Sequence, residues 1–229
     1  GQVGRNYERH TTGSVFGVFE RPVNMYRGTT MAGIVSDESR NDPTRGFVGG
    51  YELETISLGL PFYSSFMNPG AWGEDFTWFM DRYDHTAGMW IVGEDMPQES
   101  NRVTLHAIEK DQHGLPVPNV HYDDHKNDLA MREHGYEQGS KIYKAIEAIK
   151  VARSAPLSST HNLGTNRMSA TARDGVVNGW GQSHDISNLF VSDGSQFTTS
   201  GAENPTLTIV ALAIRQANYL AEQLKRNAL

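Results

Sequence analysis

Two side chains in the last third of the sequence, His161 and Asn204, have types suited to activating an alcohol. An alcohol expels hydride far more readily once its hydroxyl proton has been removed, so its oxidation requires a base. Histidine has an ordinary pKa of ~6.5, and its neutral form can accept that proton near pH 7. An asparagine amide can hold the same oxygen without changing charge. A single histidine is nevertheless more often structural, so the two residue types alone do not establish a site.

The polar run Asp193-Gly194-Ser195 follows an apolar stretch, residues 186–191, whose composition predicts a strand. Ligand sites in α/β proteins usually lie at the carboxyl end of a strand. We therefore expect this run to border a ligand site.

A helix is predicted to begin beside Asn204, which fits the N-cap position, with Pro205 as the first helical residue. Apolar residues then recur at steps of three and four, at Leu207, Val210, Ile214, Ala217, Ala221 and Leu224. This pattern favours a buried helix. Its amino end carries free backbone N–H groups and would attract an anion or an electron-rich cofactor.

These motifs together resemble the carboxy-terminal signature of the glucose-methanol-choline (GMC) oxidoreductases. The signature comprises His161-Asn162-Leu163-Gly164-Thr165, Asp193-Gly194-Ser195 and Asn204-Pro205-Thr206. The match is dense over residues 158–220 and fainter over residues 1–150. Within the family, the sequence of these motifs is most similar to that of bacterial sugar, sugar-acid and polyol dehydrogenases, such as the flavoprotein subunits of gluconate and fructose dehydrogenase.

The resemblance implies FAD-dependent oxidation of an alcohol group of a sugar, sugar acid or polyol. It makes His161 the catalytic base and Asn204 its partner, with hydride passing to the flavin N5. Four residues would contact the FAD cofactor, the first two near its ribityl-pyrophosphate and the last two beside the flavin ring: Asp193, Gly194, Pro205 and Thr206.

The FAD-binding GxGxxG turn of the family does not occur in this sequence. The chain opens with Gly1-Gln2-Val3-Gly4-Arg5-Asn6, which is similar to a segment that lies in the middle of the family's chains. We therefore expect these residues to be a fragment of a longer protein. Its missing N-terminal flavin domain would bind most of the FAD, and the isolated fragment would be inactive.

The fold class expected is α+β, an antiparallel sheet with helices on one face, plus a C-terminal strand and helix that would complete an FAD-binding α/β domain. Alternating or apolar runs predict strands over residues 13–19, 47–58, 89–92, 103–106 and 115–122. Ile142, Ala145, Ile146 and Ile149 recur at helical spacing and predict a long helix within residues 125–153. We expect two parts, residues 1–157 as mainly a substrate-binding domain and residues 158–229 as the segment with the catalytic pair.

The aromatic stretch from Pro61 to Asp84 has two interpretations, a helix and loop that cover the core or a wall lining the substrate. Tyr51, Trp72, His85 and Trp90 are further candidates for a pocket lining, and the sequence does not rank them.

Composition excludes several classes of partner. The formal net charge is -7, which argues against a nucleic-acid partner, and no apolar run is long enough for a membrane span. Cysteine is absent, so disulfides, thiolate catalysis and thiolate-bound metals are excluded within these residues.

Two other functions remain open. The cluster His121-Tyr122-Asp123-Asp124-His125, with Asp128 and His134, offers metal ligands at short spacing. A solvated turn that caps the long helix is the preferred interpretation, because no HExxH or comparable pattern is present. A non-catalytic carbohydrate-binding domain built on the sheet and its aromatics is the second. The absence of a GxSxG motif argues against serine-hydrolase chemistry.

The partners expected are a small alcohol or sugar and, by resemblance, an electron-transfer subunit. Many relatives of this type are periplasmic and reach membranes through other subunits, so a periplasmic location is an expectation taken from the resemblance alone.

Overall fold

The structure, a computed structural model, describes residues 1–67, 70–157 and 159–228. The chain forms two compact units whose segments interleave. One unit, here called the signature unit, comprises Gly1–His10, Asp95–His125 and Thr160–Leu229, and the other, the sheet unit, comprises Thr11–Glu94 and Lys126–Ser159. The expected boundary at residues 157 and 158 lies close to one of the crossings between them, and a substrate-binding role for residues 1–157 stays a prediction.

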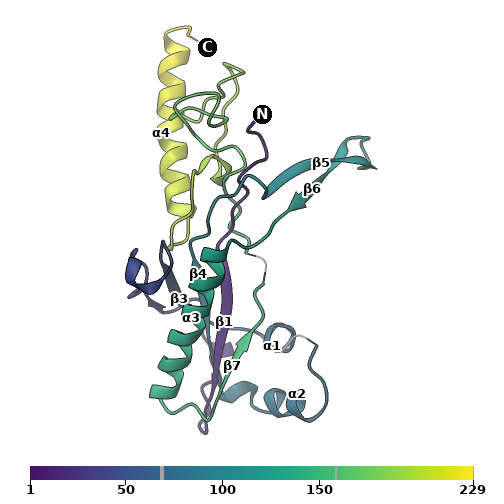
Figure 1. Ribbon diagram of the computed structural model, residues 1–229, viewed down its shortest axis with the longest axis vertical. Coiled ribbons are helices and arrows are strands. Elements are labelled where there is room, and N and C mark those ends of the chain that lie inside the picture. Colours follow the sequence, from purple (N-terminus) through teal and green to yellow (C-terminus); the bar gives the residue numbers. More distant parts are fainter. Residues whose placement is uncertain (68–69, 158, 229) are drawn as a thin grey trace. The chain divides into compact units, whose positions relative to one another are not determined.

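The sheet unit is built on five strands in the order β2-β3-β4-β1-β7, with every neighbouring pair antiparallel (Figure 1). The strands are β1 (Thr11–Val18), β2 (Ile34–Val35), β3 (Tyr51–Ile56), β4 (Thr86–Gly93) and β7 (Lys150–Ser154). Every residue of β1 is buried, because this strand lies between β4 and β7 and is covered on both faces. The α+β class with an antiparallel sheet is therefore confirmed.

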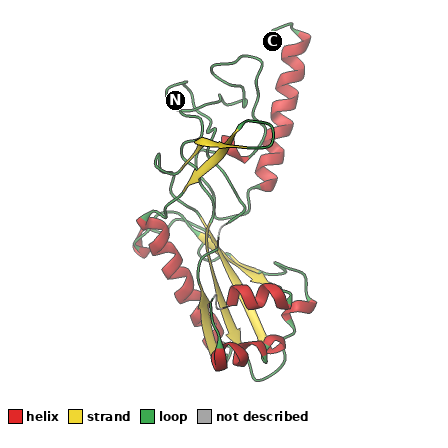
Figure 2. Cartoon of the chain, turned by 90° about the vertical axis from the view of Figure 1, so that its right-hand side faces the viewer, coloured by secondary structure: helices red, strands yellow, loops and turns green. Residues whose placement is uncertain are grey.

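Helices cover both faces of this sheet (Figure 2). Side chains of a strand alternate between faces, so Val15 joins one hydrophobic cluster and Phe16 the other. Helix α3 (Lys126–Ala145) packs on the face of Val15. Tyr63 of α1 (Leu60–Met67) and Phe79 of α2 (Gly73–Met80) pack on the face of Phe16. The expectation of helices on one face alone was too simple.

The stretch from Pro61 to Asp84 thus covers the core through Tyr63 and Phe79, which agrees with the interpretation of this stretch as a core-covering helix and loop. Trp72 differs, because its side chain is 86% exposed.

Helix α3 faces the sheet with buried residues spaced three and four apart, which is the helical period. Tyr136 and Tyr143 fill the space left by two glycines of β1. A Cβ at Gly13 would lie 2.7 Å from the Tyr136 hydroxyl oxygen, and one at Gly17 would lie 2.5 Å from Tyr143 Cδ1. The two strand glycines thereby allow the helix to approach the sheet closely.

The helix ends at Ala145, well before the expected limit of residue 153. Glu147 adopts the left-handed conformation with φ 65°, Ala148 N donates to Tyr143 O, and Glu147 N donates to Lys144 O. These two bonds make a Schellman motif, which usually has glycine where Glu147 stands. Ile146 and Ile149, whose spacing contributed to the prediction of the helix, lie beyond its end and are about half exposed. Residues 150–154 form β7 instead.

The signature unit contains a separate two-stranded hairpin, β5 (Arg102–Lys110) with β6 (Pro116–His121), and the long helix α4 (Thr206–Lys225) (Figure 1). The predicted strand over residues 186–191 does not form. Ser183 Oγ accepts hydrogen bonds from Asp185 N and Ile186 N, and Gln182 Nε2 donates to Ser187 O. These side-chain bonds hold the stretch as turns, with a single bridge between Gln182 and Phe190.

Helix α4 begins one residue later than predicted, with Pro205 at the N-cap position and no side-chain cap. The residues of its predicted apolar stripe are exposed, contrary to the expectation of burial: Leu207 is 84% exposed and Ile214 is 60% exposed. Gln216 is the buried residue of this helix, and its amide donates to Trp180 O and Val191 O. Within the described ranges, neither α4 nor any other helix combines the length and apolarity needed to cross a bilayer.

Candidate functional site

Two of the three motifs of the signature, the His161 segment and the Asp193 turn, lie side by side in the signature unit. Asn166 N donates to Ser195 O at 2.8 Å, and Met168 N donates to Gln196 O at 2.8 Å. A longer bond of 3.4 Å joins Gly164 N to Gly194 O. Backbone hydrogen bonds therefore hold the His161 segment against the residues that follow Asp193.

The amino-terminal segment pairs with the same stretch on its other side. Glu8 and Leu163 exchange backbone bonds of 3.1 and 2.9 Å, and Gly4 N donates to Thr165 O at 2.7 Å. This close approach requires glycine at position 164, because its φ is +87° and a Cβ there would overlap the carbonyl oxygen of Asn6.

Asp193 starts a short 3-10 helix, Gly194–Gln196, and its carboxylate organises that turn. Asp193 Oδ1 accepts from Ser195 N at 2.8 Å and from Ser195 Oγ at 2.5 Å. Asn166 Nδ2 donates to Ser195 Oγ at 3.1 Å. Gly194 is buried, and a Cβ there would lie 2.7 Å from Leu163 Cδ2. Asp193 and Gly194 thus occupy a built turn, although no strand precedes it.

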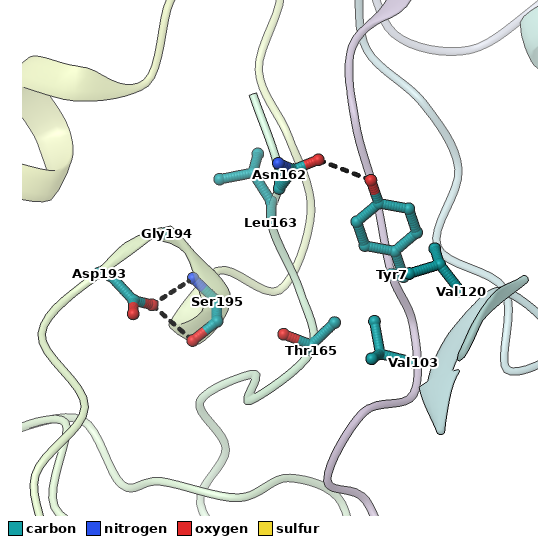
Figure 3. A pocket seen from close by; sticks show the side chains of 9 residues that line it. All are labelled: Tyr7, Val103, Val120, Asn162, Leu163, Thr165, Asp193, Gly194 and Ser195. Carbon is teal, nitrogen blue, oxygen red and sulfur yellow. Dashed lines mark hydrogen bonds between the residues drawn. The ribbon is translucent and has the colours of Figure 1, made fainter. Parts of the chain in front are cut away.

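A pocket of about 370 Å³ lies where these segments meet (Figure 3). Its lining residues come from all three segments of the signature unit: Tyr7, Val103, Val120, Asn162, Leu163, Thr165, Asp193, Gly194 and Ser195. The Tyr7 hydroxyl donates to Asn162 Oδ1 at 2.6 Å. Burial raises the pKa of the Tyr7 phenol, so it stays protonated as a donor near pH 7. The pocket combines hydroxyl, amide and carboxylate groups with a wall of aliphatic side chains.

His161 lies one residue before this lining and contacts a second histidine. Its Nδ1 atom is 3.0 Å from Nδ1 of His10, and the two rings are perpendicular, with centroids 4.8 Å apart. His10 is buried, and burial together with the neighbouring His161 lowers the pKa of His10 to about 4, against an opposing effect of the Gly201 carbonyl. His10 therefore lies near Gly201, in the loop that leads to Asn204.

The other three predicted residues stand at the start of α4. Asn204 and Thr206 are exposed and Pro205 is buried. Pro205 O accepts the first backbone bond of the helix, from Ile209 N at 3.0 Å. Among the described residues that line the pocket near Asp193, none of these three appears.

A buried polar cluster supports the loop before α4. Ser200 N donates to Glu8 Oε2 at 3.1 Å, and Ser200 Oγ donates to Asp95 Oδ1 at 3.1 Å. Asp95 Oδ2 also accepts from Arg9 N at 2.7 Å. These bonds tie the amino-terminal segment to the loop of residues 200–204.

The proposed metal ligands show a different arrangement. His121 Nε2 lies 3.1 Å from Asp123 Oδ2 in an exposed pair, and Tyr51 and Gln138 contact the His134 ring. In the part of the chain that the structure describes, no group of three or more His, Asp or Glu side chains could hold a metal ion.

Residues 97–213, just over half of the chain, match the family model described as GMC oxidoreductase. The chain belongs to the GMC oxidoreductase family. Members of this family are FAD-dependent and act on alcohol groups. The matched range contains the pocket lining except Tyr7, and it also contains His161 and Asn204.

Relatives of this GMC chain include dehydrogenases of diols, sugars and sugar acids. It is 35% identical to 2-methyl-1,2-propanediol dehydrogenase of Mycolicibacterium austroafricanum over 86% of the chain and 38% of that protein. It is 31% identical to the fructose dehydrogenase large subunit of Gluconobacter japonicus, over 63% of the chain and 27% of that protein. It is 26% identical to the gluconate 2-dehydrogenase flavoprotein of Pantoea cypripedii, over 99% of the chain and 40% of that protein. The chain thus spans well under half the length of these relatives.

Solved structures of similar fold include a pyridoxine 4-oxidase from Mesorbium loti, with a TM-score of 0.66, 15% identity, and coverage of 97% of this chain and 44% of that one. A formate oxidase from Aspergillus oryzae gives a TM-score of 0.64 at 16% identity, with coverage of 99% and 48%. At these identities the likeness supports the GMC fold.

The sequence did not identify His10 and Tyr7 as candidates for this site. Both lie in the first ten residues, where no periodicity or motif marks them. The available signal was the fainter resemblance of that segment to the family, but it did not indicate which side chains face the signature.

Proposed function

We propose that this chain supplies the carboxy-terminal half of the active site of an FAD-dependent enzyme that oxidises an alcohol group of a sugar, sugar acid or polyol. His161 is the base and Asn204 its partner. The observation that carries the proposal is the backbone pairing of residues 164–168 with residues 194–196, which unites the base and two cofactor-contact candidates in one framework.

The reaction requires three functions from the chain's own residues: accepting a proton, holding the substrate oxygen and stabilising negative charge. Nε2 of His161 accepts the proton of the substrate hydroxyl as the C–H bond breaks, since the Nδ1 atom faces His10. The Asn204 amide donates to the same oxygen and holds it through the change of charge. The donors at the start of α4 stabilise negative charge nearby. FAD, when bound, supplies the acceptor for the hydride.

The pocket fits a polyhydroxylated part of the cofactor. Hydroxyl groups of Thr165 and Ser195 and the amide of Asn162 can exchange hydrogen bonds with the ribityl hydroxyls. Among the described residues that line it, there is no Lys or Arg. We assign the main pyrophosphate donors to the GxGxxG turn of the family, which does not occur in this sequence. Pro205 and Thr206 remain the proposed neighbours of the flavin ring.

The substrate class follows from the relatives, which act on a propanediol, fructose and gluconate by their names. All three molecules carry several hydroxyl groups. The fructose dehydrogenase relative is a large subunit, which supports an electron-transfer subunit as a further partner here. A periplasmic location is part of the same proposal.

The test is a comparison of His161→Ala with wild type in the full-length, flavin-loaded protein. After a screen of diols, sugars and sugar acids, flavin reduction is followed by absorbance under anaerobic conditions. Loss of the base should slow reduction by roughly 10²- to 10⁴-fold. Asn204→Ala should slow it less, because that substitution leaves the base in place.

A matched control is His113→Ala, on the exposed turn between β5 and β6. This variant should reduce its flavin at the wild-type rate. Full activity of a flavin-loaded His161→Ala protein would exclude His161 as the base.

A further inference from the structure

The rings of His10 and His161 lie within hydrogen-bond distance of each other. His10 is 1% exposed, and its Nδ1 atom lies 3.0 Å from Nδ1 of His161. The backbone fixes both residues close by, through the bonds between Glu8 and Leu163 and the bond from Arg9 N to Asp95. These bonds hold the backbone of the two segments together beside the two rings.

Two nitrogen atoms at hydrogen-bond distance must share one proton, so one Nδ1 donates and the other accepts. His10 is neutral near pH 7, because burial and the neighbouring His161 lower its pKa to about 4. A neutral His10 has one unprotonated nitrogen and can accept a hydrogen bond there. In the tautomer that accepts at Nδ1, His10 carries its proton on Nε2, which is buried and has no hydrogen-bond partner among the described residues.

The proposed reaction discriminates between the two tautomers of His161. If His10 donated, neutral His161 would carry its proton on Nε2 and could not take one from the substrate there. Once His161 is doubly protonated, both of its nitrogens are donors, and a donating His10 would face another donor. When His10 accepts, the same Nδ1–H···Nδ1 bond persists before and after proton transfer.

We propose that His10 is a positioning residue that accepts a hydrogen bond from His161 Nδ1 and so holds His161 in the tautomer with Nε2 unprotonated. This inference rests on the proposed role of His161 as base. Because burial lowers the pKa of His10, the proton taken from the substrate stays on His161 and does not pass to His10. His10 thereby does the work of an orienting carboxylate without adding a negative charge beside the substrate.

The test pairs two substitutions in the full-length, flavin-loaded protein. His10→Phe keeps a buried ring beside His161 and removes the acceptor, whereas His10→Asn can place its Oδ1 near the position of Nδ1. Flavin reduction should slow by roughly 10- to 100-fold in His10→Phe. His10→Asn should recover most of that loss. Flavin content and thermal unfolding show whether each variant is folded.

Two readouts separate positioning from a structural role. The acid limb of the pH profile of flavin reduction should move in His10→Phe and coincide with wild type in His10→Asn. The carboxylates of Glu8 and Asp95 bond Ser200 in this unit, and the guanidinium of Arg9 lies over the Tyr122 ring. These charged groups are the same in all variants. Nitrogen-15 spectra of histidine-labelled protein, assigned with His161→Gln, should show His161 protonated at Nδ1 in wild type and a changed tautomer balance in His10→Phe.

Equal losses in His10→Phe and His10→Asn, or a His10→Phe protein with unchanged rate and pH profile, would overturn the inference while leaving His161 as base. A His161 ring protonated at Nε2 in wild type would also overturn it. Full activity of His161→Ala would instead remove the proposed function, and the nitrogen-15 spectra would still report whether His10 sets the tautomer.

Discussion

At the scale of single residues, Gly164 combines two constraints that are usually separate. Its backbone has φ +87°, and a side chain there would overlap the carbonyl oxygen of Asn6. Gly114, on the turn between β5 and β6, has nearly the same φ of +80° but open space around its Cβ position. The two glycines therefore separate the cost of the left-handed conformation from the cost of the close contact.

We expect Gly164→Ala to destabilise the protein more than Gly114→Ala. The left-handed conformation alone should cost about 1 kcal/mol in Gly114→Ala. The displaced backbone should add roughly 1–3 kcal/mol in Gly164→Ala. Urea titrations of both variants measure the free energy of unfolding, and equal losses would show that the segments around Asn6 and Gly164 are not packed as described.

At the scale of elements, helix α3 shows how a helix of low overall hydrophobicity is held against a sheet. Met131, Gly135 and Gly139 lie on the face that meets the strands. A Cβ at Gly135 would lie 3.0 Å from Ile91 Cδ1, and one at Gly139 would lie 3.0 Å from Val15 Cγ2. Close contact through small residues thus replaces the row of large apolar side chains that the sequence pattern had suggested further along the chain.

The orientation of α3 predicts different losses of stability when two nearby residues, Met131 and Leu129, are truncated to alanine. Met131 is 0% exposed and Leu129 is 51% exposed. Met131→Ala should lower the free energy of unfolding by about 2–5 kcal/mol, because it leaves a cavity against the sheet. Leu129→Ala, the matched control, should change it by less than about 1 kcal/mol. A larger loss in Leu129→Ala would mean that the helix presents another face.

At the scale of the whole molecule, the signature unit is assembled from the beginning, middle and end of the chain. The chain spans 38% of its propanediol dehydrogenase relative and 40% of its gluconate dehydrogenase relative. Helix α4 presents Leu207 and Ile214 to solvent within this chain. The pocket supplies hydroxyl and amide groups but, among its described lining, no cationic side chain for a pyrophosphate.

This arrangement predicts weak binding of FAD by the 229 residues alone. Fluorescence titration of the isolated chain should give a dissociation constant above about 100 μM, which corresponds to less than about 5.5 kcal/mol of binding free energy. The full-length protein, as the comparison, should retain flavin through purification. Submicromolar binding by the isolated chain would show that these residues hold the cofactor without the dinucleotide-binding turn.

Local patterns in the sequence correctly predicted the family, the α+β class and most strands of the sheet. Strand alternation and short motifs depend only on residues that are close together in the sequence. The same patterns failed where hydrogen bonds between residues a few positions apart favoured a turn over the predicted helix or strand. The helix of residues 126–145 ends through backbone bonds around Glu147, and the apolar run 186–191 is held in turns by Ser183 and Gln182.

The motif residues His161 and Asp193 could be named from the sequence as candidates, and their roles remain predictions. Their surroundings depended on tertiary structure. His10 and Tyr7 reach the signature because backbone pairing brings residues 4–8 against residues 163–165, more than 150 positions away in the chain. Hydrogen bonds between such distant segments leave no periodic trace in either one, so the partner of the proposed base became visible only when the chain was folded.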